Sequence, residues 1–346
     1  MVPGSSGSVA IVAIGRNEGE RLKACLRAAG ASSALVSSAL NARTVVYVDS
    51  GSADGSAEYA RGVGCRVVEL DAALPFTAAR ARNEGFACAM EHAPDTEFVQ
   101  FVDGDCELEQ GWLEAAVAAF EARDDAGLVC GRVREIHPEA SVFNRLCDLE
   151  WRQAPGEIQT AGGRFMARAR AFKEVRGFRP DVIAAEDDEF CIRVRQKGWK
   201  ILMIDAPMAR HDVAITSLSQ WWRRTRRSGH AYAQVAALHG GGRERYFVRD
   251  RRRILLWGLA LPIAALVLAP FTRGISLAVM IAAYSLQLVH IVRGCRLRGW
   301  EAKDARAYGF FTVISRFPAL QGLLEYYWRR VRGRTMTIIE YKQGNK

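Results

Sequence analysis

A chain of 346 residues and 38.3 kDa is long enough for one domain of about 200 to 250 residues and a further region. Its eight cysteines form no CxxC pair and no zinc-finger spacing, which argues against a zinc site or a disulfide framework and favours a reducing cytosol. The net charge of +10 does not predict a nucleic-acid partner, because the basic residues adjoin apolar runs rather than aromatic residues that could stack on bases. The first 15 residues lack the basic start and long apolar run of a signal peptide, so we expect this part to stay where it is made.

Residues 1–215 alternate between short β-branched runs and alanine-rich helical patterns. The expected strands are 9–14, 44–49, 65–70, 97–103, 127–133 and 200–205. The helical patterns lie near 18–29, 54–63, 76–91, 110–123 and 186–198. This alternation predicts an α/β fold with a mainly parallel sheet flanked by helices, in which ligands bind outside the carboxyl ends of the strands.

Polar residues stand at several of these predicted strand ends. Asn17 and Glu18 follow the first strand, Asp49 ends the second, and Asp103 ends the fourth, two residues before Asp105. Two carboxylates around a glycine suit Mg2+ or Mn2+, although the same three residues also form ordinary turns. Neither GxGxxG after the first strand nor a P-loop is present, so the usual dinucleotide and triphosphate cradles are not expected.

The order of the motifs is more specific than any one of them. It resembles that of family 2 inverting glycosyltransferases with the GT-A fold, over roughly residues 8–215. The segments that carry the resemblance are GRNEGERLKACL (15–26), VDSGSADGS (48–56), PFTAARARNEG (75–85), FVDGD (101–105), GGRFMARARAFKEVRGF (162–178) and AEDDEFCIRVRQKGW (185–199). The resemblance implies an enzyme that transfers a sugar from a nucleotide-diphosphate donor.

The resemblance places the nucleotide beside the first two strands. Asn17 and Glu18 match the Asn-Glu pair that follows the first strand, and Asp49 matches the first acid of the loop that reads the base. The family often has a second acid directly after it, where this chain has Ser50, so Asp49, Ser50 or backbone groups could contact the base.

The diphosphate is expected near a predicted helix. Arg80, Arg82 and Asn83 match the segment that lines it, and a guanidinium fork suits phosphate oxygens, although a helical arginine is often simply solvated. Gly163, with the glycine before it, leaves room for a sugar or acceptor to approach the backbone.

The resemblance also implies a cation that bridges the two donor phosphates. Asp103 and Asp105 would hold Mn2+ or Mg2+, and His211 stands where related enzymes often place a histidine near the metal or phosphates. A lone histidine can equally be structural.

The expected catalytic base is Asp187, which matches the aspartate of the family's Glu-Asp pair. An inverting transfer needs a carboxylate to take the proton of the attacking hydroxyl, and neighbouring acids raise the pKa of such a base. An acidic start of a helix is the alternative explanation for this cluster. The chain departs from the family at Arg176, where a glycine is common.

The C-terminal third predicts a membrane association. Ten arginines fall between residues 223 and 253, and residues 254–271 and 275–292 carry no Asp, Glu, Lys or Arg. At 1.5 Å per residue each 18-residue run spans roughly 27 Å, close to a ~30 Å hydrocarbon core, which predicts a transmembrane hairpin; a buried core hairpin is the alternative. Basic flanks on both sides place the catalytic domain in the cytoplasm, at the inner membrane.

Three regions are therefore expected: a GT-A catalytic domain (1–215), a basic amphipathic linker (216–253) and a membrane region (254–346) in which residues 308–328 are interfacial. Gln220 and Arg223 only partly match the acceptor motif of processive relatives. The expected acceptor is lipid-linked, a polyprenyl-phosphate or polyprenyl-diphosphate sugar of cell-surface polysaccharide assembly. A catalytically silent sugar-binding scaffold and, less well, a nucleotidyltransferase remain as alternatives, and the sequence does not indicate an oligomeric state.

Overall fold

The computed structural model describes residues 8–36 and 42–334, and it divides the chain into two compact units. The first, which we call the sheet unit, comprises the residues up to 137 together with 148–213. The second, the helical unit, comprises residues 138–147 and those from 214 onward. The backbone therefore passes between the units three times, at residues 137/138, 147/148 and 213/214.

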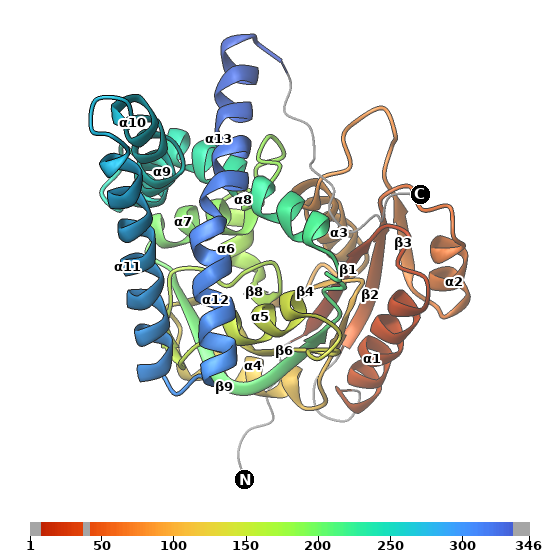
Figure 1. Ribbon diagram of the computed structural model, residues 1–346. Coiled ribbons are helices and arrows are strands. Elements are labelled where there is room, and N and C mark those ends of the chain that lie inside the picture. Colours follow the sequence, from red (N-terminus) through yellow and green to blue (C-terminus); the bar gives the residue numbers. More distant parts are fainter. Residues whose placement is uncertain (1–7, 37–41, 335–346) are drawn as a thin grey trace. The chain divides into compact units, whose positions relative to one another are not determined.

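The sheet unit is built on one nine-stranded sheet in the order β3-β2-β1-β4-β8-β6-β9-β5, with β7 paired to β9 (Figure 1). The strands are β1 (Val9–Gly15), β2 (Ala42–Asp49), β3 (Arg66–Glu69), β4 (Phe98–Asp103), β5 (Cys106–Leu108), β6 (Ala126–Glu135), β7 (Gly156–Glu157), β8 (Phe165–Arg168) and β9 (Lys200–His211). Strand β1 pairs in parallel with β2 and β4, β2 with β3, and β6 with β9. Strand β8 is antiparallel to both β4 and β6, and so reverses the direction in the middle of the sheet.

Seven helices connect these strands. They are α1 (Glu20–Val36), α2 (Ser56–Gly62), α3 (Ala78–His92), α4 (Trp112–Ala122), α5 (Val142–Glu150), α6 (Ala169–Glu174) and α7 (Glu186–Gln196). Stacked or tilted aromatic rings join β4, β8, α6 and α7 in the core, with ring centroids 4.4 to 6.2 Å apart; these rings belong to Phe101, Phe165, Phe172, Phe178 and Phe190. The predicted α/β fold with a mostly parallel sheet is confirmed. The short strands β5, β7 and β8 and the helices α5 and α6 are additions to the elements predicted from the sequence.

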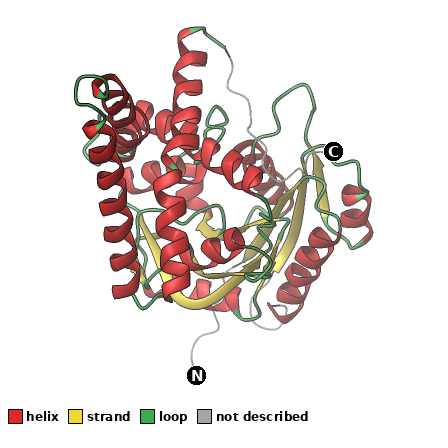
Figure 2. Ribbon diagram, viewed as in Figure 1, coloured by secondary structure: helices red, strands yellow, loops and turns green. Residues whose placement is uncertain are grey.

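The helical unit contains only helices among its described residues (Figure 2). They are residues 142–147 of α5, followed by α8 (Leu218–His239), α9 (Val248–Leu255), a π-helical turn (Leu256–Ala260), α10 (Leu261–Leu268), α11 (Ile275–Leu297), α12 (Ala302–Ile314) and α13 (Arg316–Val331). The inserted segment 138–147 belongs to this unit by its packing. Phe143 stacks on Trp221 of α8 and meets Phe311 of α12 edge-on, and Arg145 forms an ion pair of 2.9 Å with Asp304.

Helix α8 occupies most of the predicted basic linker. A capping box starts it, in which the hydroxyl of Ser217 accepts from the backbone N–H of Gln220 and the Gln220 side chain reaches back to the N-cap backbone. Gln220 is buried, and its side-chain oxygen accepts from the backbone N–H groups of Thr216 and Ser217. The partial motif match at Gln220 is therefore explained by a helix cap.

The predicted membrane hairpin corresponds to two helical segments on either side of a turn at 269–274. The first predicted span, 254–271, is divided among α9, the π-helical turn and α10. The second, 275–292, lies within α11, which is the one helix of the described residues whose length and apolar composition suffice to cross a membrane. Residues 308–328 fall in α12 and α13, with Arg316 at the start of α13.

Candidate functional site

The predicted site residues converge because β1, β2 and β4 end at the same edge of the sheet. Gly15 at the end of β1 pairs with Asp49, and Ile14 pairs with Asp103. The backbone N–H of Ser50 donates to Gly15, and that of Gly104 donates to Ile14. Two acids 54 positions apart in the sequence are thereby held on either side of one strand.

The loops after β1 and β2 are bound to each other by their own polar groups. The Asn17 side chain accepts from the backbone N–H of Ala53 at 2.8 Å, and the Asp54 carboxylate accepts from Gly19 at 2.9 Å. Asn17 adopts a left-handed backbone (φ 53°), which asparagine tolerates better than most residues. Asp54 was not singled out from the sequence, although it lies within the quoted VDSGSADGS segment.

Asp49 is almost fully buried, and both of its carboxylate oxygens have partners within the protein. Tyr47 donates to one at 3.0 Å and the backbone N–H of Ser52 donates to the other at 2.7 Å. These contacts hold the loop after β2 in place. Ser50, the next residue, is partly exposed. Base recognition by Asp49 or Ser50 stays a prediction, as does the role of Glu18, which forms an ion pair of 2.7 Å with Arg21.

Helix α3 positions the three residues predicted to line the diphosphate. The guanidinium of Arg80 donates to the carbonyl oxygens of Asp71 and Leu74, which precede the helix. The Asn83 amide both donates to and accepts from the backbone of Phe178, at 2.8 Å each way. Both side chains therefore hold neighbouring loops, and contact with a diphosphate stays a prediction for them.

Arg82 is the buried centre of a chain of charges. It donates to Asp103 at 2.9 Å and to Glu186 at 2.8 Å. Burial alone would lower its pKa, but Asp103 and Glu186 more than offset this and raise it above its usual range. A Cβ on Gly163 would stand 2.6 Å from the Arg82 guanidinium and 3.6 Å from Asp103, so this glycine is needed for the close approach.

Glu186 begins α7 and connects Arg82 with the predicted base. Burial, followed by the charges of Asp188 and Glu186, raises the pKa of Asp187 to about 7. Asp187 accepts from the backbone N–H of Asp188 at 3.0 Å and is itself only partly buried. A partly accessible carboxyl group with such a pKa suits a general base. Glu186 was read from the sequence only as Asp187's partner, and its ion pair with Arg82 could not be foreseen.

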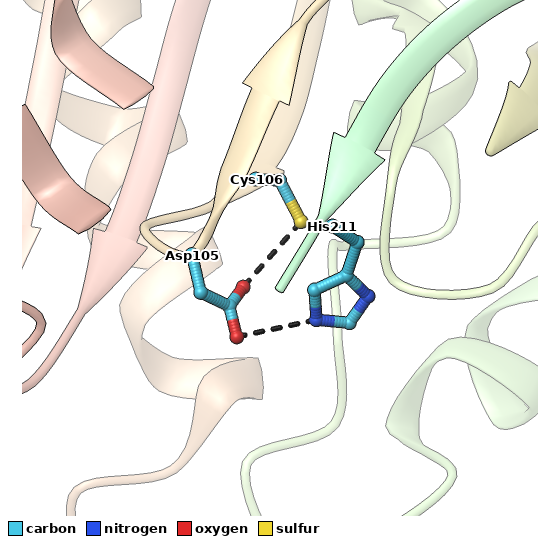
Figure 3. A group of neighbouring side chains, drawn as sticks. All are labelled: Asp105, Cys106 and His211. Carbon is cyan, nitrogen blue, oxygen red and sulfur yellow. Dashed lines mark hydrogen bonds and ion pairs between the residues drawn. The ribbon is translucent and has the colours of Figure 1, made fainter. Parts of the chain in front are cut away.

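The second cluster forms where β5 meets β9 (Figure 3). The antiparallel register sets Cys106 opposite His211, which brings His211 to Asp105 across 106 positions of sequence. The Asp105 carboxylate is 3.2 Å from Nε2 of His211 and 3.4 Å from Sγ of Cys106, and all three residues are buried. Each residue offers one atom that could bind a metal, and these three atoms all lie within 4.8 Å of one another.

His211 is held from its other side by residues that sequence reasoning did not identify. The indole of Trp151 stacks on the imidazole with ring centroids 4.8 Å apart, and Nη1 of Arg164 contacts Nδ1. The Arg164 guanidinium also lies over the Trp151 ring at 5.3 Å. Arg164 directly follows Gly163, so the glycine pair was the only sequence signal near it.

Comparisons with known proteins agree with this arrangement. Residues 8–176 match the family model described as glycosyl transferase family 2. Two curated relatives, each named pre-mycofactocin glycosyltransferase and both from Mycobacterium tuberculosis (strains CDC 1551 / Oshkosh and ATCC 25618 / H37Rv), are 27% identical over 218 residues. The match covers 59% of this chain and 44% of each relative, so it spans less than half the length of those proteins.

Solved structures share the fold at low identity. A mannosyltransferase from Pyrobaculum calidifontis, in complex with GDP-Man and Mn2+, aligns with a TM-score of 0.63 and 17% identity over 95% of this chain and 89% of its own. Residues 1–349 of TarS from S. aureus align with a TM-score of 0.50 and 13% identity over 98% of this chain and 100% of their own. These likenesses confirm the predicted GT-A type of fold, and the family match and the relatives support the predicted glycosyltransferase class. Over residues 8–176 the chain is therefore similar to glycosyl transferase family 2.

Proposed function

We propose that this protein is a metal-dependent inverting glycosyltransferase that takes a sugar from a nucleotide-diphosphate donor. The observation that carries the proposal is the pairing of two clusters at one edge of the sheet. One is the buried group of Asp105, Cys106 and His211, and the other is the chain from Asp103 through Arg82 and Glu186 to Asp187. The cluster around Asp105 would bind a cation beside the diphosphate, and the cluster around Arg82 contains Asp187, the proposed base.

The donor set fits a divalent cation. A carboxylate and an imidazole are ligands of Mn2+, and the aligned mannosyltransferase was solved with Mn2+ and GDP-Man. Asp105 and His211 would hold the ion, and Asp103, which accepts a hydrogen bond from Arg82, would lie beside it. When bound, such an ion neutralises charge on the departing nucleoside diphosphate. We propose that the ion is Mn2+ or Mg2+.

The protein's own groups would perform the proton transfer. Inversion requires the acceptor hydroxyl to attack opposite the leaving diphosphate, and Asp187 would accept its proton. Arg82 holds Glu186 beside Asp187 through a hydrogen bond of 2.8 Å, and burial together with the charges of Asp188 and Glu186 raises the pKa of the proposed base to about 7. The nucleotide end of the pocket would be formed by residues that follow β1 and β2 or lie in α3, namely Asn17, Glu18, Asp49, Ser50, Arg80 and Asn83.

We further propose a lipid-linked acceptor, a polyprenyl-phosphate or polyprenyl-diphosphate sugar used in cell-surface polysaccharide assembly. An 18-residue window of helix α11 has a mean hydropathy of 2.0 and contains no buried residue, which favours contact with lipid over a protein core. The basic run that precedes the apolar helices favours the cytoplasmic face of the inner membrane. A fixed anchor would keep the pocket within reach of a headgroup that cannot leave the bilayer.

The test is donor binding by the full-length protein in detergent. We expect a nucleoside diphosphate sugar to bind only with Mn2+ or Mg2+, and we expect Asp105→Ala to abolish that metal-dependent binding without unfolding the protein. Isothermal titration against a panel of sugar nucleotides, with and without a chelator, measures it. Asp205→Ala is the matched control, because Asp205 is exposed and forms a surface ion pair with Arg132. Chelator-resistant donor binding by the Asp105 variant would refute the metal assignment.

A further inference from the structure

Arg164 is a cation in the site whose direct contacts among the described residues are with neutral groups. Within residues 8–36 and 42–334 its guanidinium forms no ion pair, and its contacts are the imidazole of His211, the thiol of Cys106 at 4.0 Å and the face of Trp151. Arg82, in the same site, is paired with two carboxylates. The charges of Asp103 and Asp187 act on this guanidinium without forming an ion pair with it, so an anion that hydrogen-bonds to it directly would stabilise it further.

The contact with His211 fixes where the imidazole carries its hydrogen. A guanidinium has only donors, so Nδ1 of His211 must accept from Arg164. The hydrogen of a neutral ring then lies on Nε2, which faces Asp105. In this arrangement Nε2 offers no lone pair to a cation, and the positive charge of Arg164 lies on the other side of the same ring.

We propose that Arg164 binds the donor's diphosphate and thereby couples nucleotide binding to metal binding. Without an anion, the guanidinium donates to His211 and opposes a cation at Asp105 and His211. With an anion, it turns to the phosphate oxygens, for which its fork geometry is suited, and releases Nδ1. The ring can then carry its hydrogen on Nδ1 and present Nε2 to the metal. This inference rests on the proposed function, because it assigns the anion to the diphosphate of the donor.

The experiment separates the two ligands. Full-length protein and Arg164→Ala are titrated in detergent with Mn2+ alone, followed by the electron paramagnetic resonance of free Mn2+, and with GDP, UDP and inorganic pyrophosphate by calorimetry. We expect Arg164→Ala to bind the diphosphates about tenfold more weakly or worse, as for loss of a charge-assisted hydrogen bond. We expect the same variant to bind Mn2+ alone more tightly than the unaltered protein. Opposite changes are the signature of coupling, since a variant that merely disturbs the site would weaken both.

Two further variants complete the design. Arg164→Lys keeps the charge and should recover part of the diphosphate affinity. Arg170→Ala is the matched control, since Arg170 is exposed and lies over Trp199, and it should change neither affinity.

The outcomes are distinct. Equal diphosphate binding by Arg164→Ala and the unaltered protein, or parallel weakening of Mn2+ and diphosphate, would overturn the inference. Arg164-dependent binding of pyrophosphate without any binding of nucleotides would support an anion site at Arg164 and would refute the nucleotide-sugar donor. Binding of none of these anions by the unaltered protein would refute both.

Discussion

Asp187 lies in the first turn of α7 between two other acids, Glu186 and Asp188, and this position changes its chemistry. Burial and two neighbouring acids raise the pKa of Asp187, and Arg82 opposes that rise without cancelling it. The result is a carboxyl group that is half ionised near neutral pH instead of near pH 4. Such a group takes a proton more readily than an ordinary surface aspartate.

Asp187→Asn should leave donor affinity in place and lower the transfer rate by about 10²-fold or more, the lower range for loss of a general base. The base acts only when ionised, so kcat/KM of the unaltered protein should rise about tenfold per pH unit below pH 7 and level off above it. Initial rates across a pH series measure both effects.

The control for this prediction is Asp188→Asn, which removes one neighbouring negative charge. Its profile should keep the same shape and shift toward lower pH, because the pKa of Asp187 falls. Folding stability offers a second check. A raised carboxyl pKa destabilises the ionised folded state, so stability contributed by protonation is lost as pH rises from about 4 through about 7, and Asp187→Asn should lack that loss. Near-normal turnover by Asp187→Asn would assign the base elsewhere.

At the scale of elements, α8 and α13 cross through glycines. A Cβ on Gly229 of α8 would overlap the backbone carbonyl of Ala319, and one on Gly322 of α13 would overlap that of Arg226. The small residues let the two backbones approach closely, and Ala233, Leu323 and Tyr326 then form a buried core beside the crossing.

Gly229→Ala should therefore destabilise the protein by about 1–3 kcal/mol, as overpacking does, because the atoms in its way belong to the backbone. Gly294→Ala in α11 is the matched control. A Cβ there meets nothing within 4 Å, and alanine is the better helix former by roughly 0.5–1 kcal/mol, so the control should be neutral or stabilising. Thermal unfolding in detergent compares the two, and equal shifts in the same direction would contradict the close crossing.

The elements also show what could be predicted from the sequence. Long β-branched runs with a clear period gave β1, β2 and β4, because their signal is local. The three-residue strand β5 could not be found, because it is defined by its pairing with β9 rather than by its own composition. Arg176 illustrates a different limit. It adopts a left-handed backbone (φ 60°), which glycine takes more readily than arginine, although its sequence context does not predict that conformation.

The candidate site divides in the same way. Asp103, Asp105 and Asp187 were predicted from the order of motifs, and the structure places each in a cluster. The partners that set their chemistry were not predicted. Arg164 and His211 are 47 positions apart, and Arg82 and Glu186 are 104 apart, so no local pattern connects them.

At the scale of the whole molecule, the proposed membrane association depends on the apolar surface of α11. Ile281 and Leu286 are 62% and 71% exposed, which is unfavourable in water and favourable in hydrocarbon. Both belong to the uncharged run at 275–292.

Ile281→Glu combined with Leu286→Glu should shift the protein from the membrane pellet to the soluble or aggregated fraction, because a carboxylate within a bilayer costs several kcal/mol. Fractionation of expressing cells by ultracentrifugation measures this. The control is Leu297→Glu, a residue 88% exposed but beyond the apolar run, which should remain with the membranes. Unaltered protein that is found in the supernatant would refute the membrane proposal as a whole.

The three passages of the backbone between the units have a consequence for exchanging parts among related proteins. A chimaera made at a single junction near residue 214 would keep residues 138–147 of one parent while taking the remaining helices from another. Phe143 would then lack its own Trp221 and Phe311, and Arg145 would lack Asp304. The helical unit is thus discontinuous in the sequence, and a chimaera that is to fold must exchange residues 138–147 together with the residues from 214 onward.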